Sequence, residues 1–181
     1  MAQRRNVDDD IAGTARDLLR AKGPRSVTVE AVAARSGIAK TTIYRRHRDR
    51  REMLSAALTE IVTPAPLKPD AEASEVLRWV IANAVATVEQ GIGFGGYAAL
   101  LTDDDPEFTT LFRRVLRKQR AELEAVIDTG AGDGSLRADV DAATFIDAVV
   151  GAYTAERART GRVAAGWEQR LFDLFWPAVR A

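Results

Sequence analysis

The stretch Thr28–Leu54 constrains the fold of this chain more than any other part of it. It begins with a short apolar helical pattern that stops at Ser36-Gly37. A second short segment starts near Lys40 and is rich in Lys, Thr, Tyr and Arg, with Ile43 as its one plainly apolar residue. Two brief helices joined by a glycine-containing turn are typical of a helix-turn-helix. The stretch therefore predicts a helical DNA-binding module.

The second segment carries the side chains that DNA recognition uses. Cationic donors, hydroxyls and a phenol fall within two helical turns, a mixture suited to phosphate contacts and to the major groove. Ile43 is expected to anchor this helix in the core. The alternative interpretation is an ordinary exposed basic helix, but the preceding helix and turn favour DNA. The predicted DNA-contacting residues of this segment are Lys40, Thr41, Thr42, Tyr44, Arg45 and Arg46.

Charge is segregated along the chain, although the net charge is +0. Residues 1–51 carry 13 Lys and Arg against 6 Asp and Glu, and residues 52–181 carry 13 against 20. A basic first part fits a DNA-facing end, because phosphate neutralisation supplies most sequence-independent affinity. We predict a helix-turn-helix domain over 1–51 and a regulatory and dimerisation domain over 52–181, connected by a helix from about 50 to 62. Thr63–Asp70, with three prolines, is the predicted linker.

The remaining segments have helical periodicity, so we predict an all-α fold of about nine helices. Its first part is a three-helix DNA-binding domain and its second a larger helical domain. Apolar residues at i, i+4, i+7 and i+8 predict a first helix over about Asp8–Ala21. Later helices are expected over 74–90, 97–102, from Pro106 to about 127, 140–159 and 166–179. Asp128–Ala138 is predicted to be a glycine-rich loop.

Several patterns point to chemistry that the rest of the sequence does not support. Gly91–Gly96 matches the dinucleotide-binding pattern G-x-G-x-x-G, but the segment before it has helical rather than strand period, so we expect a flexible interhelical break. Asp103, Asp104 and Asp105 precede Pro106 and are interpreted as caps, not as metal ligands. The basic run from Arg113 to Arg120 is interpreted as a solvated face that pairs with nearby acids.

The composition argues against catalysis. The chain has no Cys, which excludes disulfides and Cys-based metal sites, and its one His, His47, has no second His or obvious carboxylate partner. No nucleophile is paired with a base, so we expect no enzymatic activity, cofactor or metal. No apolar run approaches the roughly 20 residues of a membrane span, and no signal peptide is evident, so we expect a cytoplasmic protein.

The last two predicted helices have more apolar surface than one subunit needs. Apolar residues cover about half of the final helix, and the helix before it has a strip of small residues that lets another helix approach closely. We therefore predict a two-fold homodimer. The predicted interface residues are Ala148, Gly151, Ala152, Ala155, Phe172, Trp176 and Val179.

Residues 11–54 resemble the tetracycline-repressor (TetR) family of bacterial regulators. The segments that carry the resemblance are Ile11, Ala12, Ala15, Leu18 and Gly23, then Thr28–Leu54, and more loosely Asp105–Phe108 and Gly134–Asp141. The resemblance implies a dimeric repressor that binds a palindromic DNA operator and is released by a small molecule. It also implies phosphate contacts for Thr28, at the start of the first motif helix, and for Arg50, at the family's phosphate-binding Lys position.

The resemblance also implies an effector site in the second domain. The candidate lining residues are aromatic and without charge, which favours an apolar effector; they are Trp79, Phe94, Tyr97, Phe112 and Tyr153. Two positions depart from the family pattern: Ala39 replaces a frequent Ser cap, and His47 replaces a frequent Phe anchor, for which we expect a packing role. The alternative function is a helical protein-binding adaptor without specific DNA recognition, which salt-dependent DNA binding would exclude.

Overall fold

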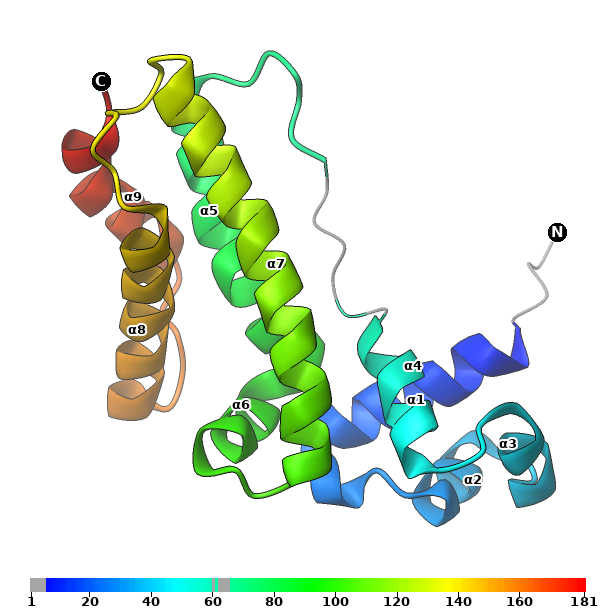
Figure 1. The fold of residues 1–181 in the computed structure, drawn as a ribbon. Helices are drawn as coiled ribbons and strands as arrows, with labels where there is room; N and C mark the ends of the chain where they lie inside the picture. Colours follow the sequence, from blue (N-terminus) through cyan, green and yellow to red (C-terminus); the bar gives the residue numbers. More distant parts are fainter. Residues whose placement is uncertain (1–5, 60, 62–65) are drawn as a thin grey trace, which may run out of the picture. The chain divides into compact units, whose positions relative to one another are not determined.

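The computed structural model describes residues 6–59, 61 and 66–181, and helices dominate all of that part of the chain (Figure 1). Its β pairing is limited to an isolated bridge between Leu136 and Arg180. The predicted all-α fold is therefore confirmed. The α-helices are α1 (Val7–Lys22), α2 (Val29–Ser36), α3 (Lys40–Arg46), α4 (Arg50–Thr59), α5 (Ala73–Ala86), α6 (Gly93–Thr102), α7 (Pro106–Gly132), α8 (Ala142–Thr160) and α9 (Trp167–Val179).

The helices form two compact units. Unit 1 consists of Met1–Thr63 with Thr87–Leu116, and unit 2 of Pro64–Ala86 with Arg117–Ala181. Unit 1 thus holds the predicted DNA-binding segment together with α6 and the start of α7. Of the predicted linker, residues 63–65 lie outside the described residues, as does Val62, and the part from Pro66 to Asp70 has no helix.

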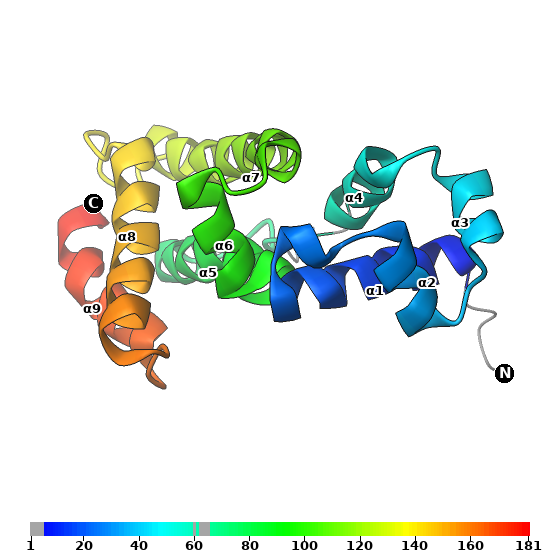
Figure 2. The ribbon, with the colours of Figure 1, turned by 90° about the horizontal axis from the view of Figure 1, so that it is seen from below.

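The core of unit 1 is built around α1, against which α2 and α4 pack (Figure 2). The stripe predicted for α1 is buried, with Ile11 and Leu19 at 0% exposure. Asn6 caps the start of α1 by accepting a hydrogen bond from the Asp8 amide, and Gly23, at φ 78°, ends the helix. Phe108 from α7 is also fully buried in this core.

The glycine-rich stretch Gly91–Gly96 is helical, so the prediction of a flexible break there was wrong. A π-helical turn, Thr87–Ile92, leads directly into α6, which begins at Gly93 instead of near Tyr97. The glycines serve close packing: Gly93 has φ +67° and a side chain on it would lie 3.3 Å from the Arg20 backbone. At position 93, both the positive φ and the close approach of α1 therefore require glycine.

In unit 2, α5 packs against both α8 and α9. Helix α7 continues to Gly132, so the loop predicted from Asp128 begins later than expected. Gly130 lets Leu136 fold back on this end of the helix: a Cβ on Gly130 would lie 2.9 Å from Leu136 Cδ1, and the Leu136 amide donates to the Gly130 carbonyl at 2.8 Å. Among the described residues, no helix is both long and apolar enough to cross a membrane.

The interpretation of the basic run as a solvated, acid-paired face agrees with two of its members. Arg120 forms ion pairs with Glu124, at 2.8 Å, and with Asp147. Lys118 lies 3.9 Å from Glu122 on the same helix. These pairs lie within unit 2, where Arg120 joins α7 to α8.

Candidate nucleic-acid interface

Local signals place the two motif helices as the sequence predicts. Thr28 is the N-cap of α2, and its hydroxyl accepts a hydrogen bond from the Ala31 amide at 3.1 Å. Gly37 ends α2 in the left-handed conformation, with φ 74°, which glycine adopts without the steric cost of a side chain. Helix α3 then begins at Lys40, at the predicted position.

Helix α3 presents a polar face outward and one apolar anchor inward. Ile43 is fully buried in the unit 1 core, which confirms its predicted anchoring role. Tyr44 is 51% exposed, an unusual degree for a large aromatic residue. Thr42 is half-buried, and the exposed members of the predicted set are Lys40, Thr41, Tyr44, Arg45 and Arg46. A phosphate backbone or a groove can therefore reach the cationic and phenolic groups of this helix.

Two of the cations on α3 contact acids within unit 1. Lys40 Nζ lies 3.3 Å from Glu30 Oε1 on α2, and both side chains are more than half exposed. A backbone hydrogen bond and, after it, the Lys40 ammonium hold the pKa of Glu30 below its ordinary value. Arg46 pairs with Asp8 at the start of α1. Exposed pairs of this kind are weak, so an incoming phosphate can displace the carboxylates.

The start of α3 lacks a side-chain cap, as the sequence indicates. Ala39 occupies the N-cap position and makes no side-chain hydrogen bond there. Its carbonyl accepts from the Thr42 amide at 2.9 Å and from the Ile43 amide at 3.2 Å. The first turn of the helix therefore has these backbone bonds but lacks the capping bond that a Ser side chain would make.

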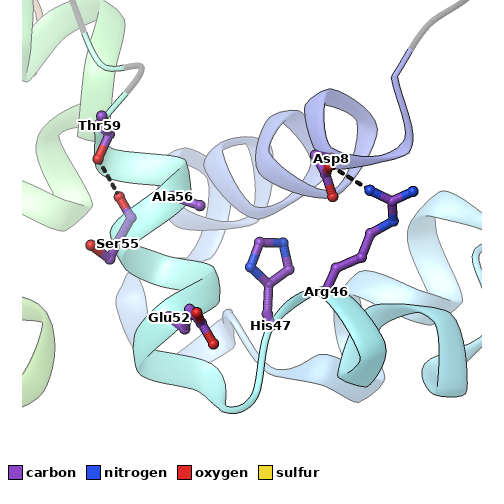
Figure 3. A pocket seen from close by; sticks show the side chains of 7 residues that line it. All are labelled: Asp8, Arg46, His47, Glu52, Ser55, Ala56 and Thr59. Atoms are coloured by element: carbon purple, nitrogen blue, oxygen red, sulfur yellow. Dashed lines mark hydrogen bonds and ion pairs between the residues drawn. The ribbon is translucent and has the colours of Figure 1, made fainter.

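His47 ends α3 and packs inward. The side chain is 7% exposed, which agrees with the predicted packing role, and its Nε2 atom is buried without a hydrogen-bond partner. Its ring lies beside an open depression of about 510 Å³ between α1 and α4 (Figure 3). The depression is lined by Asp8, Arg46, His47, Glu52, Ser55, Ala56 and Thr59. Within the described residues no group of three or more His, Cys, Asp or Glu is arranged to hold a metal ion.

Arg50 differs from the other predicted DNA contacts because its guanidinium lies within unit 1. Nε donates to the Val27 carbonyl and Nη2 to the Pro24 carbonyl, each at 2.8 Å. Nη2 also lies 2.5 Å from Asp105 Oδ2, and Nη1 lies 2.6 Å from Glu107 Oε2. The sequence indicates neither carboxylate as a partner of Arg50. The predicted capping role is confirmed for Asp105, whose Oδ1 accepts from the Phe108 amide at 3.1 Å, and for Asp103, which is the C-cap of α6.

The five aromatic candidates for an effector site divide between the two units. Phe94, Tyr97 and Phe112 belong to unit 1, and Trp79 and Tyr153 to unit 2. Phe112 is a core residue, 0% exposed and stacked on Phe108 at 5.5 Å. Tyr153 is likewise buried, 5.7 Å from the Trp167 ring. These two candidates are therefore packed in the interior of their units, whereas Trp79, Phe94 and Tyr97 are half-buried.

The residues of the predicted dimer face differ in their exposure on α9. Phe172 and Val179 are buried within unit 2 by itself, with 7% and 5% exposure. The Arg78 guanidinium covers the Phe172 ring at 3.6 Å from its centroid, and so removes that ring from the surface. Leu174 on α9 is instead 67% exposed. On α8, Gly151 and Ala155 are exposed, whereas Ala148 and Ala152 are half-buried. Trp176 on α9 is also half-buried.

A capped helix, a glycine turn and an exposed cationic second helix, in an all-helical chain, define the class of helix-turn-helix transcriptional regulators. Two family models match the chain. That of the bacterial regulatory proteins of the TetR family matches residues 11–57, and that of the tetracyclin repressor-like C-terminal domain matches residues 97–175. The chain belongs to the TetR family and is a transcriptional regulator.

Known proteins resemble the chain over most of its length. The HTH-type transcriptional regulator YdeS of Bacillus subtilis is 25% identical over 150 residues, which cover 78% of this chain and 73% of YdeS. A transcriptional regulator from Saccharomonospora viridis, solved in complex with choline, is 19% identical, with a TM-score of 0.69 over 96% of this chain and 97% of its own. The ketosteroid regulator KstR2 of Mycobacterium tuberculosis is 18% identical, with a TM-score of 0.59 over 99% of this chain and 97% of KstR2. At these identities the two solved structures show a shared fold.

Proposed function

We propose that the protein is a dimeric repressor that binds a palindromic DNA operator and is released from it by a small apolar effector. The observation that carries the proposal is the division of α3: Ile43 is buried at 0% exposure, whereas its cations and Tyr44 are exposed. An anchored helix whose polar face is open has the form of a recognition helix. Repression is the usual role within the TetR family.

In this proposal, cations position the helix and its neutral polar groups face the bases. Lys40, Arg45 and Arg46 neutralise phosphates, which supplies affinity without sequence preference. Thr41, Thr42 and Tyr44 lie between these cations along α3 and face the major groove. Thr28 directs the start of α2 at a phosphate, because free amides and the helix dipole favour an anion there. Residues 1–51, the most basic part of the chain, form the proposed DNA-binding domain, and residues 52–181 form the regulatory and dimerisation domain.

Dimerisation would give two recognition helices related by a two-fold axis, and so a palindromic site. The exposed small residues of α8, Gly151 and Ala155, let a second copy approach closely. Leu174 and Trp176 on α9 supply apolar surface to bury. The proposed interface therefore keeps Ala148, Gly151, Ala152, Ala155 and Trp176 of the predicted set and adds Leu174.

The proposed effector is apolar because the half-buried candidates Phe94 and Tyr97, both in unit 1, offer rings and no charge. Phe94 and Tyr97 face each other within unit 1, with ring centroids 6.3 Å apart. A thermal-shift screen with choline as one compound and neutral sterols or fatty acyl compounds as others would test this class. Stabilisation by choline alone would contradict an apolar effector.

The operator proposal is tested by selecting duplexes from random DNA with the purified protein and sequencing them. We expect an enriched palindrome whose binding weakens steeply as salt rises. Arg45→Ala should weaken binding and leave the oligomeric state unchanged. Arg159→Ala removes another exposed Arg, on α8, and as the matched control it should keep wild-type affinity. Failure to enrich any sequence would instead favour the protein-binding adaptor.

A further inference from the structure

The donors of Arg50 are all engaged within unit 1. Its three nitrogens carry five N–H groups. The Pro24 and Val27 carbonyls take one each. Glu107 accepts from Nη1 and Asp105 from Nη2, and Nη1 makes a further, longer contact of 3.5 Å to Asp105 Oδ1. A phosphate could bind this guanidinium only by displacing one of these acceptors.

The main acceptor is difficult to displace. The Asp105 side chain is 8% exposed, and that of Arg50 is 26% exposed, so solvent screens the pair less than it screens the pairs on α3. Asp105 is also fixed by its second role as the cap of α7, through the Phe108 amide. Separating this pair would leave a buried carboxylate without its counterion, which is unfavourable.

The contacts of Arg50 join three segments that are far apart in sequence. Arg50 lies in the first turn of α4, immediately after the recognition helix and His47. Pro24 and Val27 lie in the connection between α1 and α2, and Asp105 and Glu107 lie where α6 meets α7. A second arginine connects two of these segments, the α1–α2 connection and the α6–α7 turn. Arg25 donates to the Asp104 carbonyl at 2.7 Å and lies 2.9 Å from the Asp104 carboxylate.

We propose that Arg50 is a positioning residue for DNA binding and not a phosphate ligand: its guanidinium fixes the start of α4 and the α1–α2 connection to the α6–α7 turn. The inference rests on the proposed DNA-binding function. The planar fork of Arg is required, because a Lys ammonium cannot reach two carbonyls and two carboxylates in fixed directions. Asp105 and Glu107 support DNA binding indirectly, although as acids they would be expected to repel DNA.

The test measures the affinity for the selected duplex by fluorescence anisotropy over a series of KCl concentrations. The variants are Arg50→Gln, Arg50→Lys and Asp105→Asn, with Arg45→Gln as the matched phosphate-contact control. The slope of log K against log salt is negative, and each lost phosphate contact reduces its magnitude by about 0.9. We expect that decrease for Arg45→Gln and a wild-type slope for Arg50→Gln. The affinity of Arg50→Gln should still be lower by about tenfold, the loss expected when one base contact is displaced.

The two milder variants separate positioning from phosphate binding. Arg50→Lys should bind as weakly as Arg50→Gln, whereas a phosphate contact would survive the exchange. Asp105→Asn should weaken binding although it removes a negative charge, and the double variant Arg50→Gln/Asp105→Asn should be little weaker than either single one. Thermal melts identify the variants that are folded at the assay temperature. If Arg50→Gln is unfolded, the affinities of Arg50→Lys and Asp105→Asn test the proposal instead.

Three results would overturn the proposal: a slope decrease in Arg50→Gln like that of Arg45→Gln, wild-type affinity in Arg50→Lys, or unchanged or tighter binding by Asp105→Asn. Absence of DNA binding by the wild-type protein is a different outcome. It would refute the proposed function itself, and the positioning role for DNA binding with it.

Discussion

Gly91 and Ile61 pack so closely that a Cβ on Gly91 would overlap the Cγ2 methyl of Ile61. Ile61 is itself 4% exposed, in the core of unit 1, and Gly91 lies in the π-helical turn before α6. The Gly91 carbonyl also accepts from Arg20 Nε at 2.8 Å, which fixes the turn to α1. Glycine is therefore required at position 91 because a larger side chain would overlap Ile61, not because the turn must be flexible.

Gly91→Ala should lower the free energy of unfolding by about 1–3 kcal/mol, because overpacking a full core forces side chains and backbone to move. Urea denaturation followed by circular dichroism measures this. Gly132→Ala is the control: it also lies in a helix, and a Cβ there meets nothing within 4 Å, so its effect should be near zero or slightly stabilising. Equal stability of the two variants would contradict the steric argument.

The features that the sequence predicts correctly are those with causes within three or four residues. Thr28 and Gly37 bound α2 through their own hydrogen bonds and φ angles, and Ile43 follows from helical periodicity. The partners of Arg50 could not be predicted in this way. Asp105 lies 55 residues further along the chain, and no local pattern indicates that an aspartate chosen as a helix cap will also neutralise an arginine.

Two features that differ from the expectation drawn from sequence depend on packing between distant segments. Gly91–Gly96 has the composition of a loop but is helical, and its fit against Ile61 and Arg20 explains the glycines at 91 and 93. Phe172 is apolar and belongs to an excess apolar arc, yet the position of Arg78 decides that its ring is covered within the subunit. Hydrophobic periodicity identifies a buried face, but it does not distinguish burial against the same chain from burial against a partner.

Asp105 should make stability depend on acid pH. Burial by itself raises the pKa of this carboxyl group, but hydrogen bonds from Arg50 and from the Phe108 amide, with the charges of Arg50 and Arg25, outweigh it and leave the pKa below its ordinary value. Since the unfolded pKa is about 3.9, the ionised group contributes stability that is present above that pH. This contribution is lost as the pH falls through the folded pKa.

We therefore expect the wild-type protein to lose free energy of unfolding between about pH 5 and about pH 2, and Asp105→Asn to lose less over the same range. Chemical denaturation at a series of pH values measures both. Asp147→Asn is the comparison, because Asp147 also pairs with an arginine, Arg120, but its side chain is 66% exposed. An unchanged pH dependence in Asp105→Asn would show that other groups cause the acid loss.

Replacing His47 with Phe should stabilise unit 1. The Nε2 atom is buried without a partner, and an unsatisfied buried polar atom costs about 1–3 kcal/mol. Phenylalanine fills a similar volume with no polar atom, so we expect a gain of about 1 kcal/mol, seen as a higher melting temperature.

Thr109→Val tests the same cause at a second place, since Thr109 Oγ1 is also buried and without a partner. Thr110→Val, one residue along and exposed, is its control and should change stability little. If neither His47→Phe nor Thr109→Val raised the melting temperature, the two atoms must find partners in solution.

Ala39→Ser should stabilise the start of α3. A serine hydroxyl at this N-cap could accept from a free amide of the first turn, which contributes about 1 kcal/mol. Ala34→Ser, at an exposed position inside α2, supplies the same chemical change without a cap and should be slightly destabilising. Amide hydrogen exchange in α3 measures the local effect. Faster exchange in Ala39→Ser than in the wild type would contradict it.

Leu174→Glu should separate the proposed dimer. Leu174 is the most exposed large apolar residue of the described part of α9, at 67%, and a carboxylate there would lose its hydration on entering an apolar interface. Leu101→Glu is the matched control, because Leu101 is 64% exposed on α6 in unit 1. Light scattering coupled to size-exclusion chromatography should find a monomer for Leu174→Glu and a dimer for Leu101→Glu. The monomer should keep its binding to a half-site and lose the tighter binding to the palindrome, since only the two-fold assembly occupies both halves at once. If Leu174→Glu were still a dimer, the interface could not lie on this face of α9.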